Sequence, residues 1–273
     1  MAIPAHKHRL EVHMFKCICW SLALACILAG SLCAGQSDPF CGKWKLNQAK
    51  SKITGEQMKI EDLGGNKYKI TFGNVSDTIT ADGTDQAGNF GRTTSITPDG
   101  PNNWKMVIKK DGTVLSSMTH TLSADGKTQT IKGTDNRPDG STSDYSVHLK
   151  RVGSGSGWAG TWESTGVNLS TPDEWEIEAY EGDGLTFTTA AYHDTLSMKF
   201  DGKDYEEKGP TVAPGSASSG KRIDAHTLAV TDKVKGQVMD HTKFQVSADG
   251  KVLTLTVRDA GQPHEQTFVY DKM

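Results

Sequence analysis

The sequence predicts an all-β protein that contains two tandem antiparallel up-and-down β-barrels, with a β-sandwich as the alternative. Three observations predict this class. Short segments in which apolar and polar residues alternate recur along the chain, as expected for half-buried strands. Asp-Gly pairs, which supply the positive φ of tight hairpin turns, separate these segments at regular intervals. In addition, the second half of the chain repeats the first.

Residues 1–35 predict a signal peptide for export. A predominantly apolar run covers residues 17–32, which is short for a membrane-spanning helix and suits a secretory signal. Small residues at Cys33 and Gly35 place the cleavage after Gly35. We therefore expect a secreted or periplasmic protein that keeps no integral membrane span after cleavage. Two alternatives stay open, namely translation from Met14 and a lipid anchor in place of soluble export.

The composition restricts the partners. Lys plus Arg number 30 and Asp plus Glu number 33, so the formal net charge is -3. This balance offers no basic stripe to a phosphate backbone, and we expect no nucleic-acid partner. All cysteines except Cys41 lie in the predicted signal peptide. We therefore expect the fold to depend on its apolar core without an intramolecular disulfide. The oligomeric state is not predicted.

An internal duplication is the strongest signal in the chain. Residues 58–79 align to residues 175–196 without a gap. Just upstream, the segment Gly42-Lys-Trp44 aligns to Gly160-Thr-Trp162. Because the matches keep their order along the chain, the exported protein consists of two homologous units.

The limits of the units follow from the duplication. Residues 122–127 align to residues 246–251 near the end of each repeat. We place the first barrel unit at residues 36–152 and the second at residues 158–273. Residues 153–157, Gly-Ser-Gly-Ser-Gly, have the composition of a flexible linker.

Each unit is predicted to consist of strands. Residues 67–72, 104–109 and 252–258 are rich in β-branched and aromatic residues. The best helical fragments, residues 46–53 and 170–174, cover only one or two turns. Counting the segments gives about eight or nine strands in each unit. A sheet of that size closes on itself or splits into two layers, and consecutive hairpins favour closure.

Each unit opens with a Gly-x-Trp motif, Gly42 with Trp44 and Gly160 with Trp162. This motif, followed by meandering strands, resembles the lipocalin-like (calycin) pattern. The resemblance implies that the tryptophan plugs one end of its barrel and that a late arginine packs over it. Arg151 occupies that place at the end of the first unit, whereas the second unit has Lys272.

A second resemblance concerns shorter segments. Residues 42–52, 201–205 and 247–251 look like parts of a group of secreted bacterial β-rich proteins. The lipocalin-like resemblance implies that such a barrel holds one small, usually apolar ligand in the cup between its strands.

Aromatic side chains in the predicted strands are the candidate ligand contacts. Which of them point inward depends on the strand register, because a slip of one residue reverses the face. Trp44 and Trp162 are instead expected to be core plugs. We expect a small apolar or amphiphilic ligand to bind through Tyr68, Trp104, Trp175, Tyr180 and Phe187.

The residues after the predicted signal contain no motif of a known enzyme class or cofactor site, so we expect neither a catalytic residue nor a cofactor. Residues 135–144 are rich in oxygen ligands but lack the spacing of a calcium loop, and we expect no metal. His120 and His148 lie in predicted strands, and their convergence in one barrel would favour an enzyme.

The leading hypothesis is therefore an exported, non-enzymatic protein that binds a ligand in a β-barrel. The alternative is a structural or protein-interaction module of the cell envelope with solid barrels. An enzyme with its site in the mouth of a barrel is the third reading.

Overall fold

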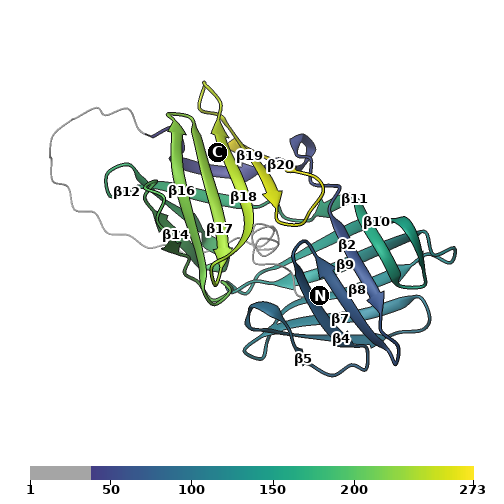
Figure 1. Ribbon diagram of the computed structural model, residues 1–273. Coiled ribbons are helices and arrows are strands. Elements are labelled where there is room, and N and C mark those ends of the chain that lie inside the picture. Colours follow the sequence, from purple (N-terminus) through teal and green to yellow (C-terminus); the bar gives the residue numbers. More distant parts are fainter. Residues whose placement is uncertain (1–37) are drawn as a thin grey trace.

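The protein is described by a computed structural model of residues 38–273 (Figure 1). Two antiparallel sheets of ten strands each curl into nearly closed barrels. Within this range the helices are three short 3-10 turns, η1 (Gln48–Lys50), η2 (Asn89–Gly91) and η3 (Ala190–Tyr192). The predicted all-β class with two barrels is confirmed. The predicted signal peptide, residues 1–35, lies outside the described residues.

The first barrel is the sheet with the spatial order β4-β3-β2-β11-β10-β9-β8-β7-β6-β5. Neighbours in this order are consecutive in the chain except for the pair β2 and β11, so the barrel is an up-and-down meander. Its strands are β2 (Gln57–Asp62), β3 (Lys67–Phe72), β4 (Val75–Thr80), β5 (Gln86–Ala87), β6 (Arg92–Pro98), β7 (Asn103–Lys110), β8 (Thr113–Leu122), β9 (Thr128–Asn136), β10 (Thr142–Ser156) and β11 (Ala159–Leu169).

The second barrel has the equivalent order β14-β13-β12-β1-β20-β19-β18-β17-β16-β15. Here β1 occupies the place that β11 has in the first barrel. The strands are β1 (Gly42–Leu46), β12 (Glu174–Tyr180), β13 (Gly184–Thr189), β14 (Asp194–Met198), β15 (Tyr205–Glu206), β16 (Ser216–Asp224), β17 (Thr227–Val234), β18 (Gln237–Val246), β19 (Val252–Asp259) and β20 (Gln266–Lys272).

The local predictions are mostly confirmed. Residues 67–72 form β3, residues 104–109 lie in β7, and residues 252–258 lie in β19. The fragment 46–53 contains η1, but residues 170–174 are not helical. There the Ser170 amide donates to the Asp144 carbonyl and extends the pairing of β10 with β11 instead. Each barrel has ten strands because the two-residue strands β5 and β15 complete it.

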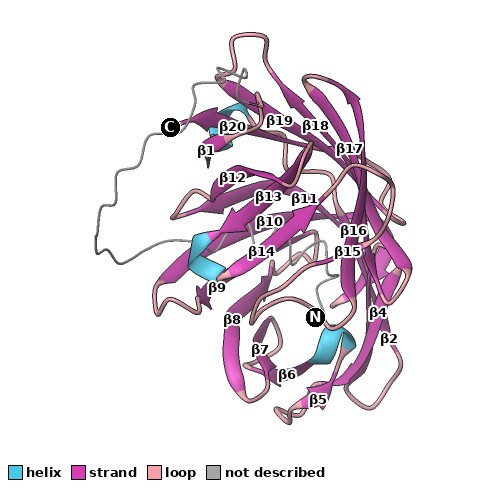
Figure 2. Cartoon of the chain, turned by 90° about the vertical axis from the view of Figure 1, so that its left-hand side faces the viewer, coloured by secondary structure: helices cyan, strands magenta, loops and turns pink. Residues whose placement is uncertain are grey.

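The two units exchange their first strands. β1 pairs with β12 and β20 in the second barrel, and Figure 2 labels it beside both. β11 pairs with β2 and β10 in the first barrel, as Figure 1 also shows. The predicted units, residues 36–152 and 158–273, therefore mark the repeats, but each barrel takes one strand from the other repeat.

A tight hairpin explains the exchange. Residues 153–156 form the end of β10 rather than a flexible linker, and Gly155 pairs with Gly160 of β11. The turn contains Gly157 with a φ of 55°, a left-handed conformation that glycine adopts freely. Because β11 folds directly back on β10, it takes the place next to β10 that β1 would otherwise occupy. The prediction of a linker at residues 153–157 is wrong for this reason.

Each barrel has its own apolar core, and the two units also share contacts. Ala191 and Tyr192 of η3 belong to the core of the first barrel although the second unit supplies them. A smaller cluster joins β4 to the second unit and consists of Val75, Ala213, Val234 and Met239, with Phe90 packed against it. The second unit therefore covers part of the first barrel.

Candidate functional site

The tryptophan of each Gly-x-Trp motif contacts a cation, and in each case the cation comes from the other repeat. The guanidinium carbon of Arg151 lies 4.2 Å from the centre of the Trp162 ring, and Nζ of Lys272 lies 5.0 Å from the centre of the Trp44 ring. Both tryptophans are fully buried. The expectation that Arg151 covers the tryptophan of its own unit, Trp44, is wrong because the first strands are exchanged.

Close approach of these cations requires glycine in both motifs. A Cβ on Gly160 would collide with Nη1 of Arg151, and a Cβ on Gly42 would lie 2.6 Å from Cε of Lys272. The φ values of +148° and +138° also disfavour a side chain. Nε of Arg151 additionally donates to the Gly126 carbonyl at 2.8 Å. Packing therefore accounts for the motif without a ligand.

The aromatic candidates of the first barrel lie together. Trp104 stacks on Trp158 with 4.0 Å between the ring centroids, and its centroid lies 4.7 Å from that of Tyr68. Trp104 is buried and Tyr68 is half-buried. These rings pack against each other near Trp162, whose indole donates to the Trp158 carbonyl at 3.0 Å. They form an aromatic cluster in the core of the first barrel.

The aromatic candidates of the second barrel do not all converge. Trp175 meets Phe187 edge to face with 6.0 Å between centroids, and both rings lie next to Phe244. Tyr180, at the end of β12, is half-buried and lies outside the apolar clusters of the described residues. Trp175 and Phe187 are therefore parts of a filled aromatic core, and Tyr180 is separate from it.

The two barrel interiors differ at a pair of equivalent positions. Strands β8 and β9 of the first barrel pair in the same register as β18 and β19 of the second. In the first barrel His120 pairs with Ile131 and Leu122 with Gln129. In the second barrel Phe244 pairs with Leu255 and Val246 with Leu253. Gln129 therefore corresponds to Leu253, and His120 corresponds to Phe244. The first barrel has a polar pair where the second has an apolar pair.

His120 and Gln129 are buried inside the first barrel, each with 1% of its surface exposed. Among the described residues, neither ring nitrogen of His120 and neither polar side-chain atom of Gln129 has a hydrogen-bond partner outside this pair. Burial lowers the pKa of His120 to about 3, and the Gln129 amide beside the ring offsets only part of this effect. The imidazole is therefore neutral at neutral pH and offers one donor and one acceptor.

Two polar side chains of β6 face the same interior. Arg92, Thr94 and Ile96 share one face of the strand because alternate residues point to the same side, and Ile96 belongs to the core. Arg92 is 3% exposed and Thr94 is 0% exposed. No described residue accepts a hydrogen bond from Nε or Nη2 of Arg92 or bonds to Oγ1 of Thr94. Burial lowers the pKa of Arg92 to about 9, against the effect of Asp135, so the side chain stays charged at neutral pH.

Side chains close the seam of the first barrel between β4 and β5. The Gln86 amide imitates a neighbouring strand, since its Oε1 accepts from the Thr80 amide at 2.8 Å and its Nε2 donates to the Thr80 carbonyl at 2.7 Å. Oδ1 of Asp77 accepts a hydrogen bond from the backbone amide of Asn89 at 3.0 Å. In the second barrel, a backbone bridge joins β14 to the segment after β15. The seam of the first barrel therefore depends on side-chain hydrogen bonds.

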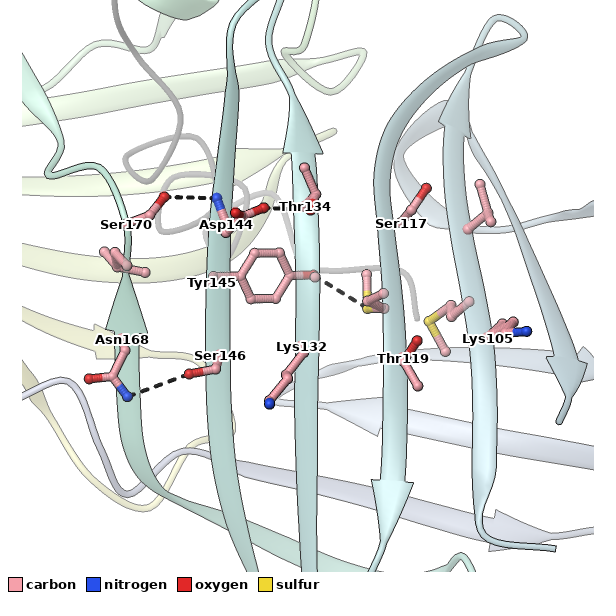
Figure 3. A pocket seen from close by; sticks show the side chains of 15 residues that line it. Lys105, Ser117, Thr119, Lys132, Thr134, Asp144, Tyr145, Ser146, Asn168 and Ser170 are labelled. Carbon is pink, nitrogen blue, oxygen red and sulfur yellow. Dashed lines mark hydrogen bonds between the residues drawn. The ribbon is translucent and has the colours of Figure 1, made fainter. Parts of the chain in front are cut away.

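An open depression of about 780 Å³ crosses strands β7 to β11 (Figure 3). Along its middle, the Tyr145 ring covers Gly133, where a Cβ would collide with the phenol. The Tyr145 hydroxyl donates to Sδ of Met118 at 3.5 Å. Flanking residues point to the opposite, outer face of the sheet and are mostly polar, among them Lys105, Ser117, Lys132 and Asn168. None of the predicted aromatic contacts lines this depression.

The residues predicted to signal an enzyme do not meet. His148 is exposed on the outer face of β10, where its Nδ1 lies 3.4 Å from Oγ1 of Thr130, whereas His120 points inward. Residues 38–273 contain no group of three His, Cys, Asp or Glu side chains arranged to hold a metal ion.

Sequence reasoning singled out His120 but missed Gln129, Arg92 and Thr94. A single polar residue in an alternating strand is normally assigned to the solvent face, and these three point inward. The repeat offers the missing signal, because the alignment pairs His120 with Phe244 and thereby marks a polar position on a core-facing row.

The chain matches no family model, and no curated protein or solved structure is significantly similar to it. The lipocalin-like resemblance therefore stays an expectation. In the described part of the chain, no helix has the length and apolar character needed to cross a membrane.

Proposed function

We propose that this chain is an exported, non-enzymatic protein that binds a small amphiphilic molecule inside its first barrel. A polar group of the ligand binds His120 and Gln129. The observation that carries the proposal is the burial of these two side chains with no hydrogen-bond partner outside the pair among the described residues.

In the free barrel, His120 and Gln129 are buried polar groups. A buried polar group without a partner costs about 1–3 kcal/mol of stability. The second barrel avoids this cost with Phe244 and Leu253 at the equivalent positions. A ligand that supplies an acceptor and a donor recovers the cost, because the neutral imidazole and the amide each offer both.

The surroundings of the pair suit the apolar part of an amphiphile. Trp104 is the cross-strand partner of His120, and Met106 and Met118 form the next inward row. Methionine side chains adapt their shape to a ligand because they are unbranched and polarisable. The ligand class that fits is therefore a molecule with an apolar body and a neutral polar group.

The packing of aromatic rings in the second barrel supports a structural role for that barrel. The ring centroids of Phe187, Phe244 and Tyr270 lie 5.7 to 6.0 Å from that of Trp175. Such packing fills an interior with aromatic contacts. The proposal therefore assigns the ligand to the first barrel and the solid-barrel alternative to the second.

Displacement of N-phenylnaphthylamine by dodecanol tests the proposal. The variant carries the residues of the second barrel, His120→Phe with Gln129→Leu, and the control is His148→Gln on the outer face. The wild type and the control are expected to bind dodecanol, and the double variant at least about tenfold more weakly. Absence of binding by the wild type, or equal binding by the double variant, overturns the proposal.

Export is tested separately. The amino-terminal residue of the protein recovered from the periplasm or medium is expected to be Gln36, because cleavage is proposed after Gly35. An amino terminus at Met1 or Met14 would contradict the proposed signal.

A further inference from the structure

Arg92 lies at the end of the first barrel that is remote from Trp162. In the sheet, Arg92 pairs with Lys110 at one end of β7. At the other end of β7, Trp104 stacks on Trp158 beside Trp162. The two ends of β7 are about 20 Å apart at about 3.3 Å per residue.

Two polar positions therefore lie near opposite ends of one interior. His120 pairs with Trp104 across β7 and β8, which places it toward the Trp162 end. Arg92 and Thr94 lie at the start of β6, toward the opposite end. The inward row between them is apolar and contains Met106.

The other cations at the Arg92 end have partners. Nζ of Lys110 donates to the carbonyls of Pro210 and Val212 at 2.7 Å each. The Arg137 guanidinium donates a hydrogen bond to the Tyr192 phenol. Tyr192 packs into the core of the first barrel from the second unit. Arg92 is the buried cation here whose Nε and Nη2 donate to no described residue.

The two free nitrogens define the geometry of a partner. Nε and Nη2 form one edge of the guanidinium, and this edge binds a carboxylate or phosphate through two parallel hydrogen bonds. Oγ1 of Thr94, on the same face of β6, adds a hydroxyl donor. Asp135 lies near enough to interact with the charge of Arg92 but does not occupy this edge.

We infer that the ligand of the first barrel is an elongated anionic amphiphile whose carboxylate or phosphate monoester binds Arg92 and Thr94. The inference rests on the proposed function, and it adds the charge, the length and the second polar contact of the ligand. A neutral polar group at the far end of the molecule then reaches His120 and Gln129.

Competition with chain-matched ligands tests the inference on the complete exported protein. The ligands are dodecanol, dodecanoate, dodecyl phosphate and ω-hydroxydodecanoate, each displacing N-phenylnaphthylamine. An anion on the buried guanidinium is expected to strengthen binding about 10- to 100-fold over dodecanol. The tighter of dodecanoate and dodecyl phosphate identifies the anionic group, and ω-hydroxydodecanoate is expected to bind more tightly than dodecanoate.

The variants separate recognition from a structural role. Arg92→Met is expected to bring the ratio of dodecanoate to dodecanol affinity down to about one, and Arg92→Lys to restore part of it. Arg258→Met, at an exposed arginine of β19, is the control and leaves the ratio unchanged. If Arg92→Met does not fold, Thr94→Val gives the same test with a smaller expected drop.

The outcomes are distinguishable. Equal binding of dodecanol and the two anions by the wild type overturns the inference and leaves the proposed function standing. An unchanged affinity ratio in Arg92→Met also overturns it. Failure of every ligand to bind, dodecanol included, overturns the proposed function as well.

Discussion

Replacing His120 by phenylalanine is expected to change how the stability of the protein depends on pH. The ordinary pKa of histidine is 6.5, and burial lowers that of His120 to about 3 in the folded chain. Between these values the unfolded chain binds a proton that the folded chain does not, so stability falls as the pH falls below 6.5. Each pH unit in this window costs about 1.4 kcal/mol, and the cost at pH 5 is about 2 kcal/mol.

Urea unfolding followed by tryptophan fluorescence measures the effect on ligand-free protein at pH 7.5 and pH 5. The wild type is expected to lose about 2 kcal/mol more than His120→Phe between the two conditions, because carboxylates common to both proteins cancel in the difference. At pH 7.5 the variant removes a buried polar imidazole but inserts a larger ring, so the pH difference is the cleaner quantity.

The exposed His148 supplies the control for this experiment. His148→Gln is expected to follow the wild type at both pH values, since the side chain lies on the outer face of β10. Equal losses of stability in the wild type and in His120→Phe would refute the reasoning, because they would mean that the imidazole reaches water in the folded protein.

Three further predictions concern the fold around the site. Gly160→Ala is expected to destabilise the protein by about 1–3 kcal/mol in the same urea titration, because the new Cβ meets Arg151 and the backbone φ is positive. Gly166→Ala is the control and is expected to change stability little, because its Cβ would lie 3.6 Å from the nearest atom, Cδ2 of His148. Gln86→Ala removes the amide that closes the β4–β5 seam and is expected to speed dodecanol release, which stopped-flow fluorescence would record; an unchanged rate would place the entrance elsewhere. Cysteines at Lys45 and Asp271, paired in register between β1 and β20, are expected to form a disulfide detectable by peptide mapping, and its absence would contradict the strand exchange.

The sequence allows the strands and the barrels to be predicted because both depend on local patterns. Alternation places residues 67–72 in a strand, and Asp-Gly turns connect neighbouring strands into hairpins. The exchange of β1 and β11 is different in kind. Both strands carry Gly-x-Trp near their start and fit between equivalent neighbours, so their sequences do not determine which barrel accommodates them. The short hairpin at Gly157 determines that β11 pairs with β10. Its sequence has the composition of a flexible linker, so it does not predict a hairpin.

The candidate site was only partly predictable. Trp104, Trp175 and Phe187 are predicted ligand contacts; they belong to the barrel cores, where they pack against other rings rather than around an open cup. Arg92 could not be recognised, because an arginine in a strand is normally solvated and its burial depends on the register of β6 with β7 and on cover from the second unit.

Native mass spectrometry of the protein recovered from its export compartment tests the central claim most directly. The wild type is expected to carry a bound small molecule, and the variant with His120→Phe and Gln129→Leu is expected to be free of it. Bare polypeptide in the wild type, or the same bound mass in both proteins, would contradict ligand binding at this pair of residues.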